Sequence, residues 1–86
     1  MTKEQRQQLA DYRYESAQCE LKMRQLQMKR AELRVEELEC RRRGELVTEE
    51  WRQEMIEAEK ALQQVREAQS RLHLAIDQLY DEIENS

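Results

Sequence analysis

The stretch Arg41-Arg42-Arg43-Gly44-Glu45-Leu46-Val47-Thr48-Glu49-Glu50-Trp51 decides the fold, because it ends one helix and starts another. Three arginines suit the negative end of a helix dipole, and Gly44, the chain's only glycine, can take the left-handed conformation that often follows a helix. Thr48 can cap the next helix, with two glutamates in its first turn. We therefore predict a single domain over residues 1–86, with helices at about 3–43 and 49–82 and a turn at about 44–48.

Each predicted helix carries apolar residues at the alternating three- and four-residue spacing of a coiled-coil seam. The helix-two seam consists of Trp51, Met55, Ala58, Leu62, Val65, Gln69, Leu72, Ile76, Leu79 and Ile83. The first stripe of helix one consists of Ala10, Tyr14, Ala17, Leu21, Arg24, Met28, Ala31, Val35 and Leu38. Folding back at Gly44 sets Ala31 opposite Leu62 and Val35 opposite Ala58, so that small residues face large ones. The patterns predict an all-α fold, an antiparallel two-helix coiled-coil hairpin.

Each of the two series contains one polar residue, Arg24 in the first stripe and Gln69 in the helix-two seam. The same register places these two residues opposite each other. Such a polar layer would fix the register, because a shifted pairing would bury an unpaired donor against hydrocarbon. The alternative is that Arg24 extends its aliphatic stem to solvent and adds no specificity.

Helix one also has a second stripe on its far side, which a helix that packs only on helix two would not need. Its members recur every seven residues or flank residues that do. They are Tyr12, Cys19, Met23, Leu26, Leu33 and Cys40, with Leu9 beside them, and we predict that they form a protein interface. The simplest partner is a second copy, which would give a homodimeric four-helix bundle with parallel or antiparallel helix-one pairing. A helix of another protein could use the same stripe.

Composition agrees with long helices. The 86 residues include no proline, no phenylalanine and 40% charged residues, which is unfavourable for a sheet. Residues 1–44 hold 11 Lys/Arg against 8 Asp/Glu and residues 45–86 hold 4 against 11, so the two arms of the hairpin attract each other. No apolar run approaches the length that spans a bilayer, and the N-terminus lacks a secretory signal. We expect a cytoplasmic protein without a membrane contact.

The residues that carry catalysis or bind metals are few. His73 is the only histidine, and Cys19 and Cys40 lie 21 residues apart, roughly 31 Å along a helix, so they can join neither in a metal site nor in a disulfide within one chain. Two copies could bring cysteines together in an interchain disulfide. A phosphate-binding loop needs more than one glycine. We expect no catalytic residues, no cofactor and no metal.

These observations predict a non-enzymatic protein-interaction module that acts as an adaptor, assembly factor or inhibitor. The alternative is a small helical chaperone that holds an amphipathic client helix on the second stripe. The third candidate is a nucleic-acid-associated regulator, suggested by basic residues such as Lys22, Lys29 and Arg30. These residues are spread around the helix and alternate with glutamates in an acidic chain, so direct binding of nucleic acid is not expected.

Overall fold

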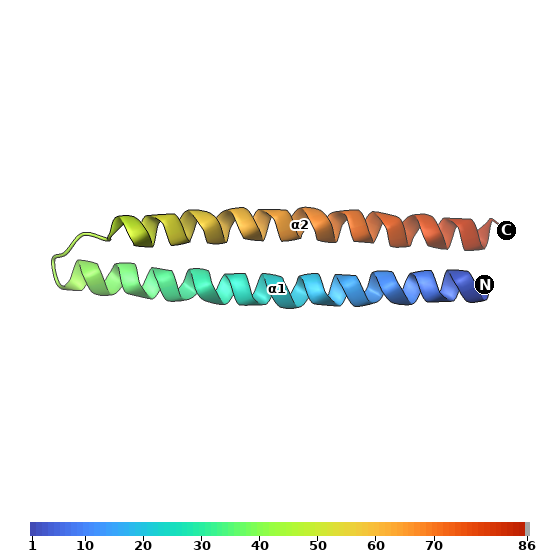
Figure 1. The fold of residues 1–86 in the computed structure, drawn as a ribbon, viewed down its shortest axis with the longest axis horizontal. Coiled ribbons are helices and arrows are strands. Elements are labelled where there is room, and N and C mark those ends of the chain that lie inside the picture. Colours follow the sequence, from blue (N-terminus) through green and yellow to red (C-terminus); the bar gives the residue numbers. More distant parts are fainter. Residues whose placement is uncertain (86) are drawn as a thin grey trace.

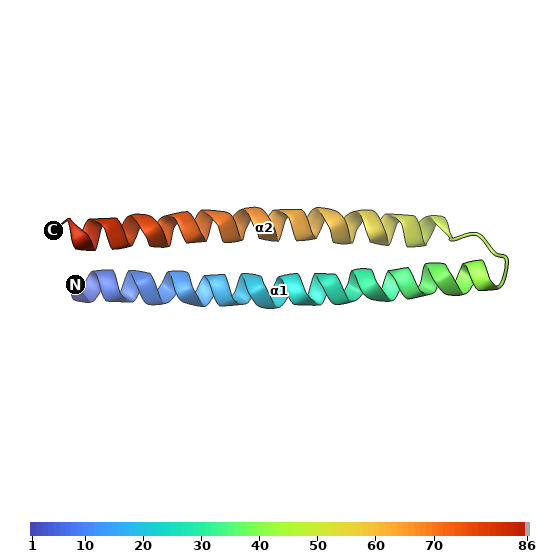
Figure 2. The ribbon, with the colours of Figure 1, turned by 180° about the vertical axis from the view of Figure 1, so that it is seen from behind.

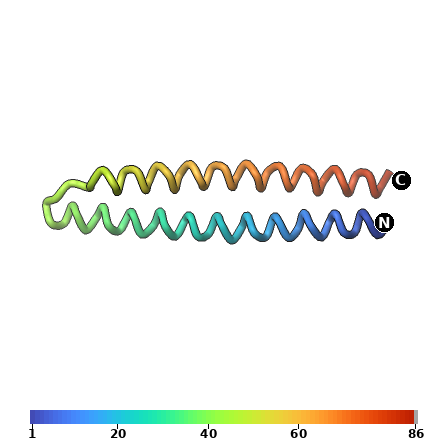
Figure 3. The backbone as a smooth tube through the Cα atoms, in the orientation of Figure 1, coloured from blue at the N-terminus to red at the C-terminus, as the bar shows by residue number. Residues whose placement is uncertain are grey.

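The computed structural model describes residues 1–85 and consists of two long α-helices that lie side by side in opposite directions (Figure 1). Helix α1 spans Lys3–Arg42 and helix α2 spans Glu49–Glu84. The molecule measures 65 × 15 × 14 Å, and the view from behind shows the same two-helix rod (Figure 2). The tube in Figure 3 shows that both chain ends lie at the end of the rod opposite the turn. The predicted all-α hairpin is confirmed.

Helix α1 begins in a capping box formed by Thr2 and Gln5. The hydroxyl of Thr2 accepts a hydrogen bond from the Gln5 amide at 3.0 Å, and the Gln5 side-chain oxygen accepts one from the Thr2 amide at 2.9 Å. Both bonds satisfy amides that have no partner inside the helix. The start of α1 is therefore determined by its own first residues.

Helix α1 ends in a Schellman motif centred on Gly44, whose φ is 71°. The Gly44 amide donates to the carbonyl of Arg41 at 3.0 Å, and the Glu45 amide donates to the carbonyl of Cys40 at 2.9 Å. A positive φ is accessible to glycine without the steric cost that a Cβ atom brings. The chain then turns through Leu46 and half-buried Val47 to the start of α2.

Helix α2 begins at the cap formed by Thr48, whose hydroxyl accepts a hydrogen bond from the Trp51 amide at 3.1 Å. Glu49 and Glu50 add negative charge to the first turn, where the helix dipole favours it. All ten residues of the helix-two seam are buried or half-buried against α1, and Leu62 is 1% exposed. The predicted seam of α2 is thus confirmed.

The predicted seam of α1 is wrong, because the first stripe faces solvent. The exposed fractions of its large apolar members are 65% for Tyr14, 59% for Leu21, 62% for Met28, 55% for Val35 and 44% for Leu38. The second stripe lies against α2 instead: Leu33 is 2% exposed, Leu9 is buried, and Tyr12, Cys19, Met23, Leu26 and Cys40 are half-buried. The two faces of α1 are exchanged relative to the prediction.

The predicted pairing fails together with the face assignment. Val35 and Ala31 are exposed and do not cover Ala58 and Leu62. The side chain of Arg24 is 74% exposed and forms an ion pair of 2.8 Å with Glu20 on its own helix, so it makes no layer with Gln69. Gln69 remains half-buried, and its side-chain oxygen has no hydrogen-bond partner among the described residues.

Candidate protein-interaction surface

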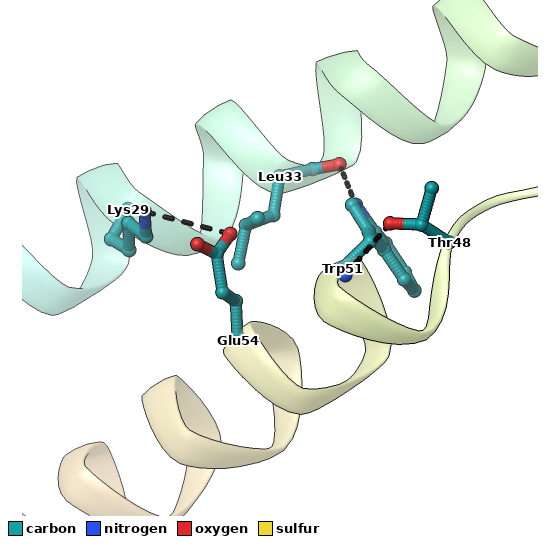
Figure 4. Close-up of polar contacts among 5 residues, drawn as sticks. All are labelled: Lys29, Leu33, Thr48, Trp51 and Glu54. Carbon is teal, nitrogen blue, oxygen red and sulfur yellow. Dashed lines mark hydrogen bonds and ion pairs between the residues drawn. The ribbon is translucent and has the colours of Figure 1, made fainter.

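Two contacts near the turn hold the inward face of α1 against α2 (Figure 4). The indole N–H of Trp51 donates a hydrogen bond of 2.7 Å to the backbone carbonyl of Leu33. One turn further along the rod, the ammonium group of Lys29 lies 3.8 Å from the carboxylate of Glu54. A part-buried indole N–H needs an acceptor, and here it finds one only because Leu33 points towards α2. Both contacts are made with α1 rotated so that buried Leu33 faces α2.

A third contact joins the helices near the chain ends. The guanidinium group of Arg13 donates a hydrogen bond to the phenol oxygen of Tyr80. Both side chains are long and reach across the outside of the seam, so the bond lies at the surface. The rotation of α1 is therefore held near both ends of the rod.

The consequence of this rotation is an exposed apolar surface along α1. Because the two stripes lie on opposite sides of the helix, α1 has little net amphipathicity, whereas α2 is clearly one-sided. The large exposed side chains of the first stripe extend from Tyr14 to Leu38, roughly 36 Å of helix. Apolar residues scattered singly on a surface are ordinary, but a continuous exposed row is typical of an interaction surface.

The first stripe combines large side chains with two small ones. Tyr14, Leu21, Met28 and Val35 recur every seven residues, and the intervening positions hold Ala17, Arg24, Ala31 and Leu38. Ridges of large side chains are thus separated by low positions at two alanines. A surface of this shape can receive the large side chains of another helix in its low positions.

Charged residues border the first stripe unequally on its two sides. On one side of the stripe, three of the five flanking residues are arginines. On the other side, all five are acids or amides. The first flank is Arg13, Glu20, Gln27, Arg34 and Arg41, and the second flank is Asp11, Gln18, Gln25, Glu32 and Glu39. Flanking charges of this kind select the orientation of a partner helix.

The residues predicted to form a protein interface lie mainly within the hairpin. Leu33 is covered by α2, and Cys19 lines a shallow hollow between the helices together with Lys22, Ala61 and Ala68. Cys40 is half-buried at the end of α1, where its sulfur lies 3.6 Å from a guanidinium nitrogen of Arg43. Since this face already contacts α2, it offers a second molecule much less surface than predicted. The regular spacing of the first stripe is the signal in the sequence that could have located the exposed face, and it is equally compatible with a hairpin seam.

The turn carries charge but no enclosed site. The guanidinium group of Arg43 lies 3.3 Å from the carboxylate of Glu45, and this hydrogen bond raises the pKa of Arg43 above its usual value. Arg43, like any arginine, is positively charged at physiological pH. Gly44 and Thr48, predicted as turn residues, form the helix end and the helix cap described above.

Residues 1–85 contain no group of histidine, cysteine or acidic side chains arranged to hold a metal ion. Neither helix, within that same part of the chain, is apolar enough over the required length to cross a membrane. No protein-family model matches the chain, and none of the curated proteins or solved structures compared with it is significantly similar. A functional interpretation therefore depends on the geometry of the hairpin itself.

Proposed function

We propose that the chain is a non-enzymatic protein-interaction module that binds through the first stripe of α1. The observation that supports this function is the exposure of five large apolar side chains, at the three- and four-residue spacing of a coiled-coil seam, along one helix face. Leaving this row in water is unfavourable, by about 25 cal/mol for each Å² of apolar surface that a partner could cover. The proposal keeps the expected kind of function and moves its surface from the second stripe to the first.

The proposed assembly is a homodimer of four helices. The first stripe lies on the side of α1 opposite α2. When a second copy packs on that stripe, the two α1 helices lie next to each other in the middle and the two α2 helices lie on the outside. This arrangement is a flat layer of helices. A square bundle would require a smaller angle, around the axis of α1, between the face that contacts α2 and the face that contacts the second copy. The proposed location is the cytoplasm, which agrees with two unpaired cysteines.

The proposal is tested by the mass of the protein under reducing conditions, measured by light scattering over a range of concentrations. Leu21→Glu should abolish the dimer, because it places a charge in the proposed interface. Leu74→Glu is a matched control: Leu74 is exposed to the same 59% as Leu21 but lies on α2. It should leave the dimer intact.

The outcomes separate the parts of the proposal. A monomeric wild-type protein at all concentrations would refute the homodimer and leave the helix of another protein as the partner to be sought. A dimer that persists equally in both variants would exclude the first stripe as its interface. Far-UV circular dichroism of both variants controls for loss of the hairpin.

A further inference from the structure

We propose that the second copy binds with its α1 antiparallel to the first, in a register that places Val35 opposite Ala17 and Leu21 opposite Ala31 of the second copy. This inference rests on the proposed function, because it specifies the orientation of the dimer formed by the first stripe. It follows from the positions of the two alanines among the large side chains, from Arg24, and from the charges on the flanks.

Side-chain size favours the antiparallel orientation. In a parallel pair each residue of the stripe meets its own copy, so Ala17 would meet Ala17 and Leu21 would meet Leu21. In such a pair, the layers of two large residues hold the helices apart, and the layers of two alanines then contain voids. Atoms that line a void lose dispersion contacts. In the antiparallel pair, Val35 of one copy lies opposite Ala17 of the other, and Leu21 lies opposite Ala31. Each alanine therefore faces a larger side chain.

The register follows from the extent of the stripe. With Val35 opposite Ala17, Tyr14 meets Leu38 and Met28 meets Arg24 of the second copy. Every exposed large residue from Tyr14 to Leu38 then has a partner, and each contact occurs twice about a twofold axis. Shifting one helix by a heptad in either direction leaves residues at one end of the stripe without a partner.

Arg24 argues against the parallel orientation. In a parallel pair the two copies of Arg24 would lie side by side in one layer, which is unfavourable for like charges near an apolar interface. In the antiparallel register each Arg24 lies beside Met28 of the second copy, so the two Arg24 residues occupy neighbouring layers instead of the same one. Its guanidinium group can remain on Glu20, with which it already forms an ion pair of 2.8 Å.

The flanks carry the third argument. The antiparallel register brings Glu20 near Arg34 of the second copy, twice and close to the centre of the interface. At the ends it brings Arg13 near Arg41, and Asp11 near Glu39. Arg41 is already paired with Glu37 at 3.2 Å, and Arg13 is bonded to Tyr80, so these two cations are partly compensated within their own chains. The opposite charges are therefore central and the like charges peripheral.

Disulfide trapping tests the orientation in a chain whose native cysteines are replaced, Cys19→Ala and Cys40→Ser. The double variant Ala17→Cys with Val35→Cys should form a covalent dimer on oxidation, whereas each single variant should not. Residues 17 and 35 of one chain lie roughly 27 Å apart along α1, so they cannot bond to each other. Covalent dimers of both single variants would overturn the proposal in favour of a parallel pair.

A mixing experiment tests the same register without cysteines. Glu20→Lys and Arg34→Glu should each weaken the homodimer about tenfold, because two opposite-charge contacts become like-charge contacts. An equal mixture of the two variants should restore wild-type affinity, since both contacts of the mixed dimer are again between opposite charges. Failure of the mixture to exceed the separate variants would overturn the register. If wild type is a dimer by mass while both tests fail, the orientation is wrong and the proposed function stands; a monomeric wild type refutes the homodimer itself.

Discussion

The indole N–H of Trp51 lies 2.7 Å from the backbone carbonyl oxygen of Leu33 and donates a hydrogen bond to it. The bond joins the first turn of α2 to a residue that α1 buries, and it links two positions 18 residues apart in the chain. The bond therefore shows which face of α1 lies against α2.

Trp51→Phe should reduce the free energy of unfolding by about 0.5–1.5 kcal/mol, the net value of a typical hydrogen bond. Phenylalanine keeps an aromatic ring in the seam but cannot donate to the Leu33 carbonyl. Urea unfolding followed by far-UV circular dichroism measures the loss. Equal stability of the two proteins would show that the bond contributes nothing in solution.

Leu33→Ala should destabilise the hairpin by about 2–5 kcal/mol, because Leu33 is 2% exposed and its truncation leaves a cavity in the seam. Val35→Ala should change the stability of the monomeric hairpin by less than about 0.5 kcal/mol, since Val35 faces solvent. Unfolding at low protein concentration, followed by Trp51 fluorescence, measures both changes. The reverse order of the two values would restore the face assignment predicted from the sequence.

The predictable parts of the fold are the local ones. Thr2 with Gln5, Gly44 and Thr48 determine where helices begin and end through bonds to residues a few positions away, so their roles can be read from short stretches. The helix-two seam was also predictable, because α2 has a single apolar face. In both cases the sequence pattern admits one solution.

The rotation of α1 was not predictable in this way. Both of its stripes keep heptad spacing, so periodicity does not decide whether Leu33 or Val35 faces α2. The decision depends on the path of the turn and on the acceptor that the Trp51 indole reaches, and both are properties of the folded hairpin. The same ambiguity affects the candidate surface: the residues predicted to form an interface lie mainly against α2, and the equally regular first stripe is the face left exposed.

Gly44→Ala should cost about 1–2 kcal/mol, because a φ of 71° is unfavourable for a residue with a Cβ atom. Among the described residues, no heavy atom beyond the two chain neighbours lies within 4 Å of the position that this Cβ would occupy, so the cost is conformational and does not come from steric crowding. Gly44→Asn should cost less, since asparagine tolerates this conformation. Thermal unfolding of the three proteins gives the ranking, and equal losses for alanine and asparagine would contradict it.

Thr48→Ala should cost about 0.5–2 kcal/mol, the usual value of an N-cap side chain. The lost bond is the one from the Trp51 amide to the Thr48 hydroxyl, at 3.1 Å. Thr48→Asp is the matched control, because a carboxylate can accept the same bond and suits the positive end of the helix dipole. Denaturant unfolding compares the variants, and a stable Thr48→Ala protein would mean that the start of α2 is held by its packing alone.

The ion pair between Lys29 and Glu54 should contribute at most about 1 kcal/mol, because the two side chains are about half exposed and their charged groups lie 3.8 Å apart. A double-mutant cycle with Lys29→Met and Glu54→Gln isolates the pairwise coupling from the other effects of each substitution. The coupling should decrease as salt is raised, since exposed charges are screened. A coupling of several kcal/mol, or one that salt leaves unchanged, would contradict the description of this pair as a weak, solvent-exposed contact.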